Sequence, residues 1–146
     1  MRKIAIGLLV AAAWLRVSAA ELDWMTDLPK AQAKAKEEKK MVMLDFTGSD
    51  WCGFCIKLHK EVFSTRAFAE YAKNNLVLVE VDFPTKKKQS AELKAANAEL
   101  QKRYKIDGYP TIVVLNGEGK KIGELGYMAG GPKTFIAALD KVKKKA

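Results

Sequence analysis

The sequence predicts an α/β sandwich in which helices cover both faces of a central mixed β-sheet. Helical and strand patterns alternate along the chain without an internal repeat, one strand pattern is apolar almost throughout, and a glycine-containing turn joins the last two strands. The chain has 146 residues, which is enough for one domain with a real core and too short to suggest two. We therefore expect a single domain at residues 21–146.

Residues 1–20 have the layout of a secretory signal peptide. A basic start ("MRK") is followed by an apolar run at 4–15 and by the small residues "VSAA". The apolar run falls short of the roughly twenty residues that span a bilayer. We expect cleavage after Ala19 or Ala20 and a periplasmic or secreted protein. The alternative is an uncleaved run that tethers the protein to the membrane.

The chain is basic, and its positive residues occur in clusters. The net charge of +9 becomes +6 without the first twenty residues, which carry three basic residues and no acidic one. The clusters lie at 30–40, 86–88 and 141–145 and lack the interleaved aromatic residues that binding to single-stranded nucleic acid requires. We expect solvated helix faces and tails, with an acidic partner or an anionic membrane surface as the alternative. Nucleic acid is not an expected partner.

The first half of the mature chain predicts a helix, a strand and two further helices. Residues 29–40 are rich in Ala, Lys and Glu and have a proline at their start, which predicts an exposed first helix. The apolar run "MVMLDF" at 41–46 predicts a buried strand that ends at "GSD". Apolar residues then recur at helical spacing from Cys52 or Gly53 to Phe63 and, after a break at "FST", up to "KNN".

The second half predicts a strand, a helix, a hairpin and a last helix. Residues 76–83 are β-branched and nearly all apolar, which predicts a central strand parallel to the first. After the charged loop "PTKKKQ", Ser90 is placed to cap a helix. The strands at 111–115 and 120–127 flank "NGEG" and predict an antiparallel hairpin, and Pro132 marks the first turn of the C-terminal helix.

The two cysteines of the chain, Cys52 and Cys55, are separated by only two residues. A crosslink that closes so small a loop stabilises a fold weakly, so redox chemistry explains the pair better than structure does. At the start of a helix, free backbone N–H groups and the helix dipole favour a Cys52 thiolate. We expect an exposed Cys52 to attack a disulfide and a sheltered Cys55, one turn later, to resolve the mixed disulfide.

Two motifs together resemble the thioredoxin superfamily. "WCGFC" follows an apolar strand and "GYPT" precedes a later one, a combination far more specific than CxxC alone. The resemblance covers nearly the whole chain from about residue 30. It is strongest to exported bacterial thioredoxin-like proteins and to the thioredoxin-like domain of membrane disulfide-interchange reductases. It implies a thioredoxin-like fold, here with an extended helical segment at 84–105 before the proline loop.

The resemblance also implies a substrate-binding surface around the cysteines. It implies that Pro110 is cis and faces them, and that the backbone of Tyr109 pairs with an extended substrate segment. Bonds preceding proline are the ones that adopt cis at low cost. Trp51, Gly53 and Phe54 complete the expected surface, with Trp51 packing beside the site.

Asp45, in the first predicted strand, matches the acid that in thioredoxins relays the proton of the resolving cysteine. A buried carboxyl group has a raised pKa, which suits a general base toward Cys55. The alternative is a structural, hydrogen-bonded aspartate. For Asp50 we expect solvation in preference to an influence on Cys52. His59 is expected to be an ordinary surface histidine, because two thiols and one imidazole make no standard metal site.

The resemblance and the residues together predict an exported thiol–disulfide oxidoreductase that reduces protein disulfides. No charged residue or histidine separates the cysteines, which favours a reductant over an oxidant. An oxidase or isomerase is the alternative within the same chemistry, and a binding or metal-delivery module is the non-enzymatic alternative. Expected partners are protein disulfides and an upstream thiol donor, such as a membrane reductase. We expect no cofactor or metal, and a monomer, since no segment is spare enough for dimerisation.

Overall fold

Five strands form one mixed sheet at the centre of the molecule. The structure is a computed structural model that describes residues 21–145, so the predicted signal peptide lies outside the described residues. The elements in chain order are β1 (Trp24–Met25), α1 (Leu28–Glu38), β2 (Met41–Thr47), α2 (Gly53–Leu58), η1 (His59–Phe63), α3 (Arg66–Asn75), β3 (Leu76–Asp82), α4 (Ala91–Arg103), β4 (Thr111–Leu115), β5 (Lys121–Leu125) and α5 (Gly131–Lys143).

The strand order is β1-β3-β2-β4-β5, with β1, β3 and β2 parallel and with β4 antiparallel to both β2 and β5. The parallel pairing of β3 with β2 and the β4–β5 hairpin are confirmed. The predicted central position of β3 is also confirmed, since β3 lies between β1 and β2, and β2 is the middle strand of the five. Both strands are mostly apolar and almost wholly buried because each is covered by helices on its two faces, and their acidic residues lie toward their C-terminal ends.

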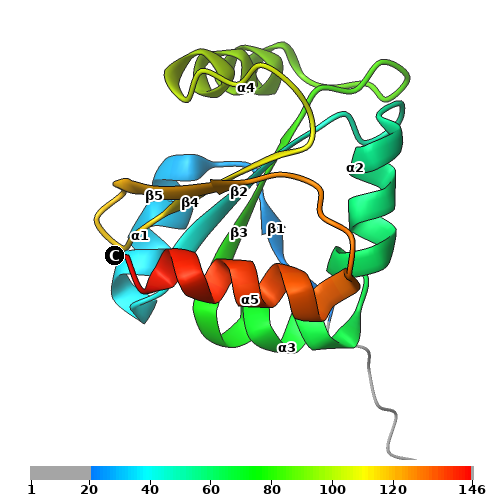
Figure 1. Cartoon of the computed structure of the whole chain (residues 1–146). Helices are drawn as coiled ribbons and strands as arrows, with labels where there is room; N and C mark the ends of the chain where they lie inside the picture. Colours follow the sequence, from blue (N-terminus) through cyan, green and yellow to red (C-terminus); the bar gives the residue numbers. More distant parts are fainter. Residues whose placement is uncertain (1–20, 146) are drawn as a thin grey trace, which may run out of the picture.

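Helices cover the sheet on both sides (Figure 1). Side chains of α1 and α4 pack on one face, and those of α2, η1, α3 and α5 pack on the other. On β2, Val42 and Leu44 belong to the first core, while Met41 and Met43 belong to the second. The alternation follows from the pleat of a strand, which sends successive side chains to opposite faces. The predicted sandwich is confirmed, and its topology is that of a thioredoxin-like fold.

The helix starts follow the predicted capping residues. The Ser90 side chain accepts a hydrogen bond from the Leu93 backbone at 3.1 Å, which caps α4, and Pro132 lies in the first turn of α5. Asp27 caps α1 by accepting from the backbone of Lys30 at 3.0 Å. These local signals set where each helix begins.

Two local features differ from the sequence prediction. The helix predicted to run to Phe63 is α-helical only to Leu58, and its last five residues form the π-helical turn η1, in which the Ser64 backbone donates to the His59 carbonyl at 2.8 Å. The extra residue in this turn directs both Val62 and Phe63 into the core. The two-residue strand β1 was not predicted, because a strand this short has no readable period.

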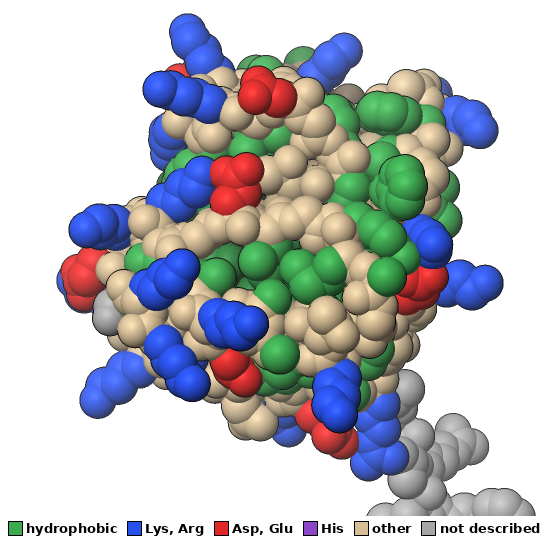
Figure 2. Space-filling view, viewed as in Figure 1, with side chains coloured by type: hydrophobic (Ala, Val, Ile, Leu, Met, Phe, Trp, Pro, Cys, Tyr) green, Lys and Arg blue, Asp and Glu red, His purple; other side chains and the backbone are tan. Residues whose placement is uncertain are grey.

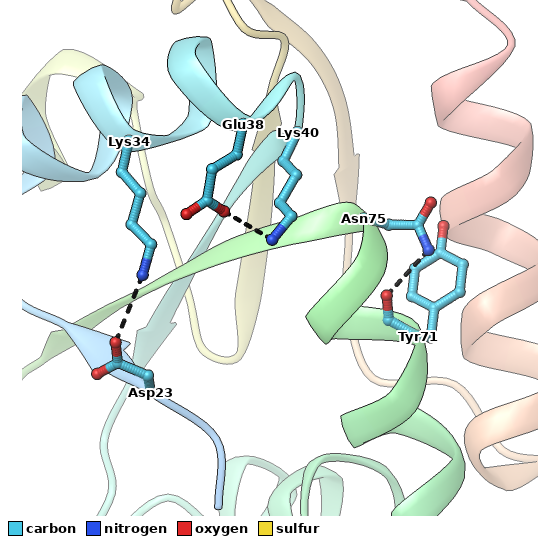
Figure 3. A network of polar contacts seen from close by, with 6 residues as sticks. All are labelled: Asp23, Lys34, Glu38, Lys40, Tyr71 and Asn75. Carbon is cyan, nitrogen blue, oxygen red and sulfur yellow. Dashed lines mark hydrogen bonds and ion pairs between the residues drawn. The ribbon is translucent and has the colours of Figure 1, made fainter. Parts of the chain in front are cut away.

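Polar contacts hold the chain around the start of β1 and the ends of α1 and α3 (Figure 3). Lys34 of α1 reaches Asp23 beside β1 at 3.6 Å, and the Asn75 side chain donates to the Tyr71 carbonyl at 2.9 Å in the last turn of α3. Among residues 21–145, no helix has the length and apolar character needed to cross a membrane.

Candidate active site

Cys52 and Cys55 form a disulfide at the start of α2, with their Cα atoms 5.2 Å apart. Cys52 is the N-cap residue of the helix, and the backbone N–H of Cys55 donates to its Sγ at 3.3 Å. The predicted placement on the first helical turn is therefore confirmed. A negative charge on this sulfur would meet a hydrogen-bond donor and the positive end of the helix dipole.

The two cysteines differ less in exposure than expected. Cys52 is 7 % exposed and Cys55 is 4 % exposed, so the prediction of one exposed and one sheltered cysteine is wrong for this oxidised form. In the disulfide each sulfur covers part of the other. The solvent-exposed surface around Cys52 is formed by apolar side chains.

An apolar rim surrounds Cys52. In the part of the chain that the structure describes, the exposed large hydrophobic side chains are Trp51 (47 % exposed), Phe54 (58 %) and Ile56 (48 %), all within four residues of Cys52. Figure 2 shows hydrophobic side chains gathered over α2, with Lys and Arg side chains beside them. Gly53 is the exposed first residue of α2. Ile56 belongs to this rim but was not singled out from the sequence, where it looked like any residue on the solvent side of a helix.

Tyr109 and Pro110 lie on the loop before β4, and the peptide bond between them is cis, as the resemblance implied. The rings of Trp51 and Tyr109 meet edge to face with centroids 5.9 Å apart, so this loop lies beside the cysteine motif. Phe83 packs on Tyr109 at 5.3 Å, and the Gln101 side chain donates to the Tyr109 hydroxyl at 2.5 Å. These contacts bring the proline loop and the CxxC turn into one surface.

Asp45 is buried in β2, on the sheet face that α2 covers. Its Oδ1 atom has no hydrogen-bond partner within residues 21–145. Burial, followed by the neighbouring carboxyl groups of Glu80 and Asp82, raises the pKa of Asp45 to about 8. The predicted raised pKa is confirmed in direction. The orphaned oxygen does not fit a purely structural, hydrogen-bonded aspartate.

Glu80 and Asp82 make this a site with three carboxyl groups, which the sequence analysis missed. In the register of the parallel strands Asp45 lies opposite Glu80, and both belong to the face that carries α2. Burial and Asp82 raise the pKa of Glu80, while Lys87 and His59 act in the opposite direction. Asp82 accepts hydrogen bonds from the Ser49 backbone at 3.0 Å and from its hydroxyl at 2.5 Å. Only the register of β2 against β3 reveals the cluster.

Asp50 is not the merely solvated side chain that was expected. Its carboxylate accepts backbone N–H groups from Thr85, Lys86 and Lys87 at 2.9, 2.7 and 2.8 Å. These donors, Thr85 first, lower the pKa of Asp50 to about 2. The Trp51 indole also donates to the Phe83 carbonyl at 2.7 Å. The charged loop after β3 is thus fastened to the turn that carries Cys52.

Residues 21–145 contain no cluster of three or more His, Cys, Asp or Glu side chains with the geometry of a metal site. His59 is an exposed residue at the start of η1, where its ring meets the edge of Phe63 at 6.4 Å. This position agrees with the expected surface histidine.

Comparison with known protein families shows that residues 28–143 match the model described as a thioredoxin-like domain. Among curated proteins, the chain is 35 % identical over 128 residues to the disulfide bond reductase DsbH of Chlamydia pneumoniae, covering 88 % of this chain and 76 % of DsbH. It is 31 % identical over 103 residues to the thioredoxin-related protein DsbJ of the same organism, covering 70 % of this chain but only 30 % of the relative.

Among solved structures, the chain is similar to a protein titled DsbH oxidoreductase. The two share 32 % sequence identity and superpose with a TM-score of 0.80, over 99 % of this chain and 94 % of the other. The likeness extends over the entire sheet and its helices, not only over the cysteine motif.

Proposed function

The chain belongs to the thioredoxin-like domain family, and from that premise we propose that it is a thiol–disulfide oxidoreductase that reduces protein disulfides through Cys52 and Cys55. The observation that carries the proposal is the position of Cys52. Its sulfur caps α2, accepts the Cys55 N–H at 3.3 Å and lies inside an exposed apolar rim. That is the environment in which a thiolate is both stabilised and reachable by a polypeptide.

The proposed reaction moves two electrons from the cysteine pair to the client. In the dithiol form the Cys52 thiolate attacks one sulfur of the client disulfide, and the other client sulfur leaves as a thiolate that takes up a proton. Cys55 then loses its proton and attacks the Sγ of Cys52, which releases the second client thiol. The protein ends as the disulfide seen in the structure, and an upstream dithiol restores it.

The ionised form of Asp45, a minor population at neutral pH because the pKa is about 8, is proposed to take the proton of Cys55 in the second step. A buried carboxyl group with a pKa of about 8 exchanges protons with a thiol at little energetic cost near neutral pH. Trp51, Gly53, Phe54, Tyr109 and Pro110 are proposed to form the surface that binds the client segment. Their proximity is supported by the contact between Trp51 and Tyr109.

The reductive direction is supported by the neutral residues Gly53 and Phe54 between the cysteines. It also agrees with the name of the relative DsbH, a disulfide bond reductase. An oxidase or isomerase would use the same two sulfurs. A binding or metal-delivery module is the non-enzymatic alternative.

We further propose that the protein is exported by residues 1–20 and works as a monomer in the periplasm or outside the cell. The upstream donor would be a dithiol protein that reaches this compartment, such as a membrane disulfide-interchange reductase. No organic cofactor is required, since the electrons reside on the two sulfurs.

Reduction of insulin by dithiothreitol with the purified protein tests the activity. Cys52→Ser is expected to lose catalysis, and Cys55→Ser is expected to trap a mixed disulfide with the client that survives non-reducing electrophoresis. Activity that survives in Cys52→Ser would rule out the proposal. Equilibration with defined glutathione ratios then gives the reduction potential, and a value above that of glutathione would favour the oxidase alternative.

A further inference from the structure

The charged loop that follows β3 lies directly beside the cysteine turn. Asp50, two residues before Cys52, accepts the backbone N–H groups of Lys86 and Lys87 at 2.7 and 2.8 Å. Two residues span at most about 7 Å, so these backbone nitrogens lie within roughly 13 Å of the Cys52 Cα atom. That separation is close to the Debye length of about 10 Å at 0.1 M salt, and charges on this loop therefore act on groups that approach Cys52.

The loop is held in place by more than one contact. Trp51 donates to the Phe83 carbonyl at 2.7 Å, and the Lys87 ammonium donates to the Ser49 hydroxyl at 3.0 Å. Together with the three backbone bonds to Asp50, these contacts tie residues 49–51, which directly precede Cys52, to residues 83–87. A flexible basic tail would contribute little orientation, whereas a fastened loop presents its charges at a fixed place.

The lysine side chains of this loop are not paired with carboxylates in the described part of the protein, although the Lys87 ammonium also donates to the Ser49 hydroxyl. Lys86, Lys87 and Lys88 are exposed, and none of them takes part in the ion pairs found within residues 21–145. On the other side of the rim, Lys57 is already engaged with Glu61 at 3.9 Å and with the Tyr127 ring at 5.1 Å. Positive charge without an ion-pair partner among the described residues is therefore available on the loop side of Cys52.

We propose that this surface selects client disulfides whose cysteine is flanked by acidic residues. An apolar client residue would cover the rim of Trp51, Phe54 and Ile56 while the acidic residues meet Lys86, Lys87 and Lys88. Complementary charges of this kind raise the rate of encounter more than they raise final affinity. The inference rests on the proposed function, because it concerns the substrates of the same cysteine pair.

Three peptide substrates test the proposal. Each is a short peptide with one intramolecular disulfide and an apolar residue beside one cysteine, and they differ only in carrying three Glu, three Gln or three Lys at the neighbouring positions. Pre-reduced protein is mixed with each peptide in a stopped-flow instrument, and the second-order rate constant is measured between 20 and 500 mM NaCl. We expect the Glu peptide to react about tenfold faster than the Gln peptide at low salt and the advantage to vanish at high salt.

Matched variants locate the charges responsible. In K86Q/K87Q/K88Q the Glu-to-Gln rate ratio is expected to fall to about one or two, while the backbone donors to Asp50 remain. The control K141Q/K144Q/K145Q removes the same charge from the end of α5, remote from α2 in Figure 1, and should keep the wild-type ratio.

Each result bears on the proposal. A wild-type ratio near one, or an equal fall in both triple variants, would overturn the inference while leaving the reductase intact, provided that the Gln peptide is reduced. If the pre-reduced protein reduces none of the peptides, the proposed function fails and the inference falls with it.

Discussion

Asp45 is a carboxyl group that the fold keeps protonated near neutral pH. Its pKa is about 8 in the folded protein, against an ordinary value of 3.8 for an aspartate side chain. A raised carboxyl pKa means that the unfolded chain releases this proton first, so the contribution of Asp45 to stability is greatest below about pH 4 and is lost as the pH rises to about 8. Above that range the loss is complete and constant.

Asp45→Asn should therefore stabilise the oxidised protein at neutral pH and not at pH 4. At about 1.4 kcal/mol per pKa unit, the gain at pH 7 is on the order of 3 to 4 kcal/mol. Urea unfolding at pH 4, 7 and 9 measures it, with the exposed Asp107→Asn as the control. A stability difference that is independent of pH would contradict the buried, neutral carboxyl group.

The same variant should resolve mixed disulfides at least tenfold more slowly if Asp45 is the proton relay.

Glu80 should set the pH at which Asp45 titrates. It lies opposite Asp45 in the register of β2 and β3, and its charge raises the pKa of Asp45. Glu80→Gln removes that like charge, so the Asp45 carboxyl should ionise at a lower pH. Carbon-13 NMR of the side-chain carboxyls against pH reads this directly, and the exposed Glu99→Gln serves as the control. An unchanged or higher titration midpoint in Glu80→Gln would show that the two groups do not interact.

The difference between Asp45 and Glu80 shows what the sequence can reveal about a site. Asp45 could be predicted because it lies at a fixed offset before the cysteine motif on one continuous segment. Glu80 and Asp82 come from a strand more than thirty positions away, and only the strand register places them beside Asp45. Asp50 was misjudged for the same reason, because its partners at 85–87 approach only once the loop has folded back.

At the level of helices and strands, clear local patterns of apolar residues and turn signals were sufficient to predict most elements. The apolar run of β2, the Ser90-capped start of α4, the proline in the first turn of α5 and the β4–β5 hairpin all lie where the pattern placed them. The π-helical turn at His59–Phe63 could not be predicted, since its residues suit an α-helix equally well. It arises because the core accepts Phe63, whose ring packs on Phe68 and Phe135 at 4.9 and 5.6 Å.

Helix α4 should be the part of the sandwich that opens most easily. Of its 13 residues only Asn97 and Leu100 are buried, and the Asn97 side chain donates to the Asp82 carbonyl at 3.0 Å. Asn97→Ala removes this anchor at a cost of about 1 kcal/mol, which is roughly a fivefold loss of protection. Hydrogen exchange should show faster exchange in α4 and no change in β2. The exposed Lys94→Ala is the control, and an equal acceleration across the sheet would show that α4 does not open on its own.

At the scale of the whole molecule, the redox state of the cysteine pair and the stability of the fold are linked. The disulfide forms more favourably in the folded protein than in the unfolded chain by some free energy. By the thermodynamic cycle, the free energy of unfolding of the oxidised protein exceeds that of the reduced protein by the same amount. A protein that acts as an oxidant is more stable as the dithiol, because its folded state favours the thiolate strongly. In this chain the residues between the cysteines are uncharged, and the Cys52 sulfur accepts a hydrogen bond from the Cys55 N–H at the helix start.

We therefore expect the oxidised protein to be more stable than the reduced one by about 1 to 3 kcal/mol, which corresponds to roughly 20 to 65 mV of reducing power in a two-electron couple. Parallel urea titrations at pH 7, with and without a dithiol reductant, measure the difference. Gly53→Ser, at an exposed position with open space around it, is the control that leaves the order unchanged. Phe54→His adds a group that stabilises the Cys52 thiolate, so it should reduce or reverse the stability difference between the oxidised and reduced forms. If the wild-type protein is instead more stable as the dithiol than as the disulfide, it acts as an oxidant. The Cys52–Cys55 disulfide would then be transferred to a pair of client thiols.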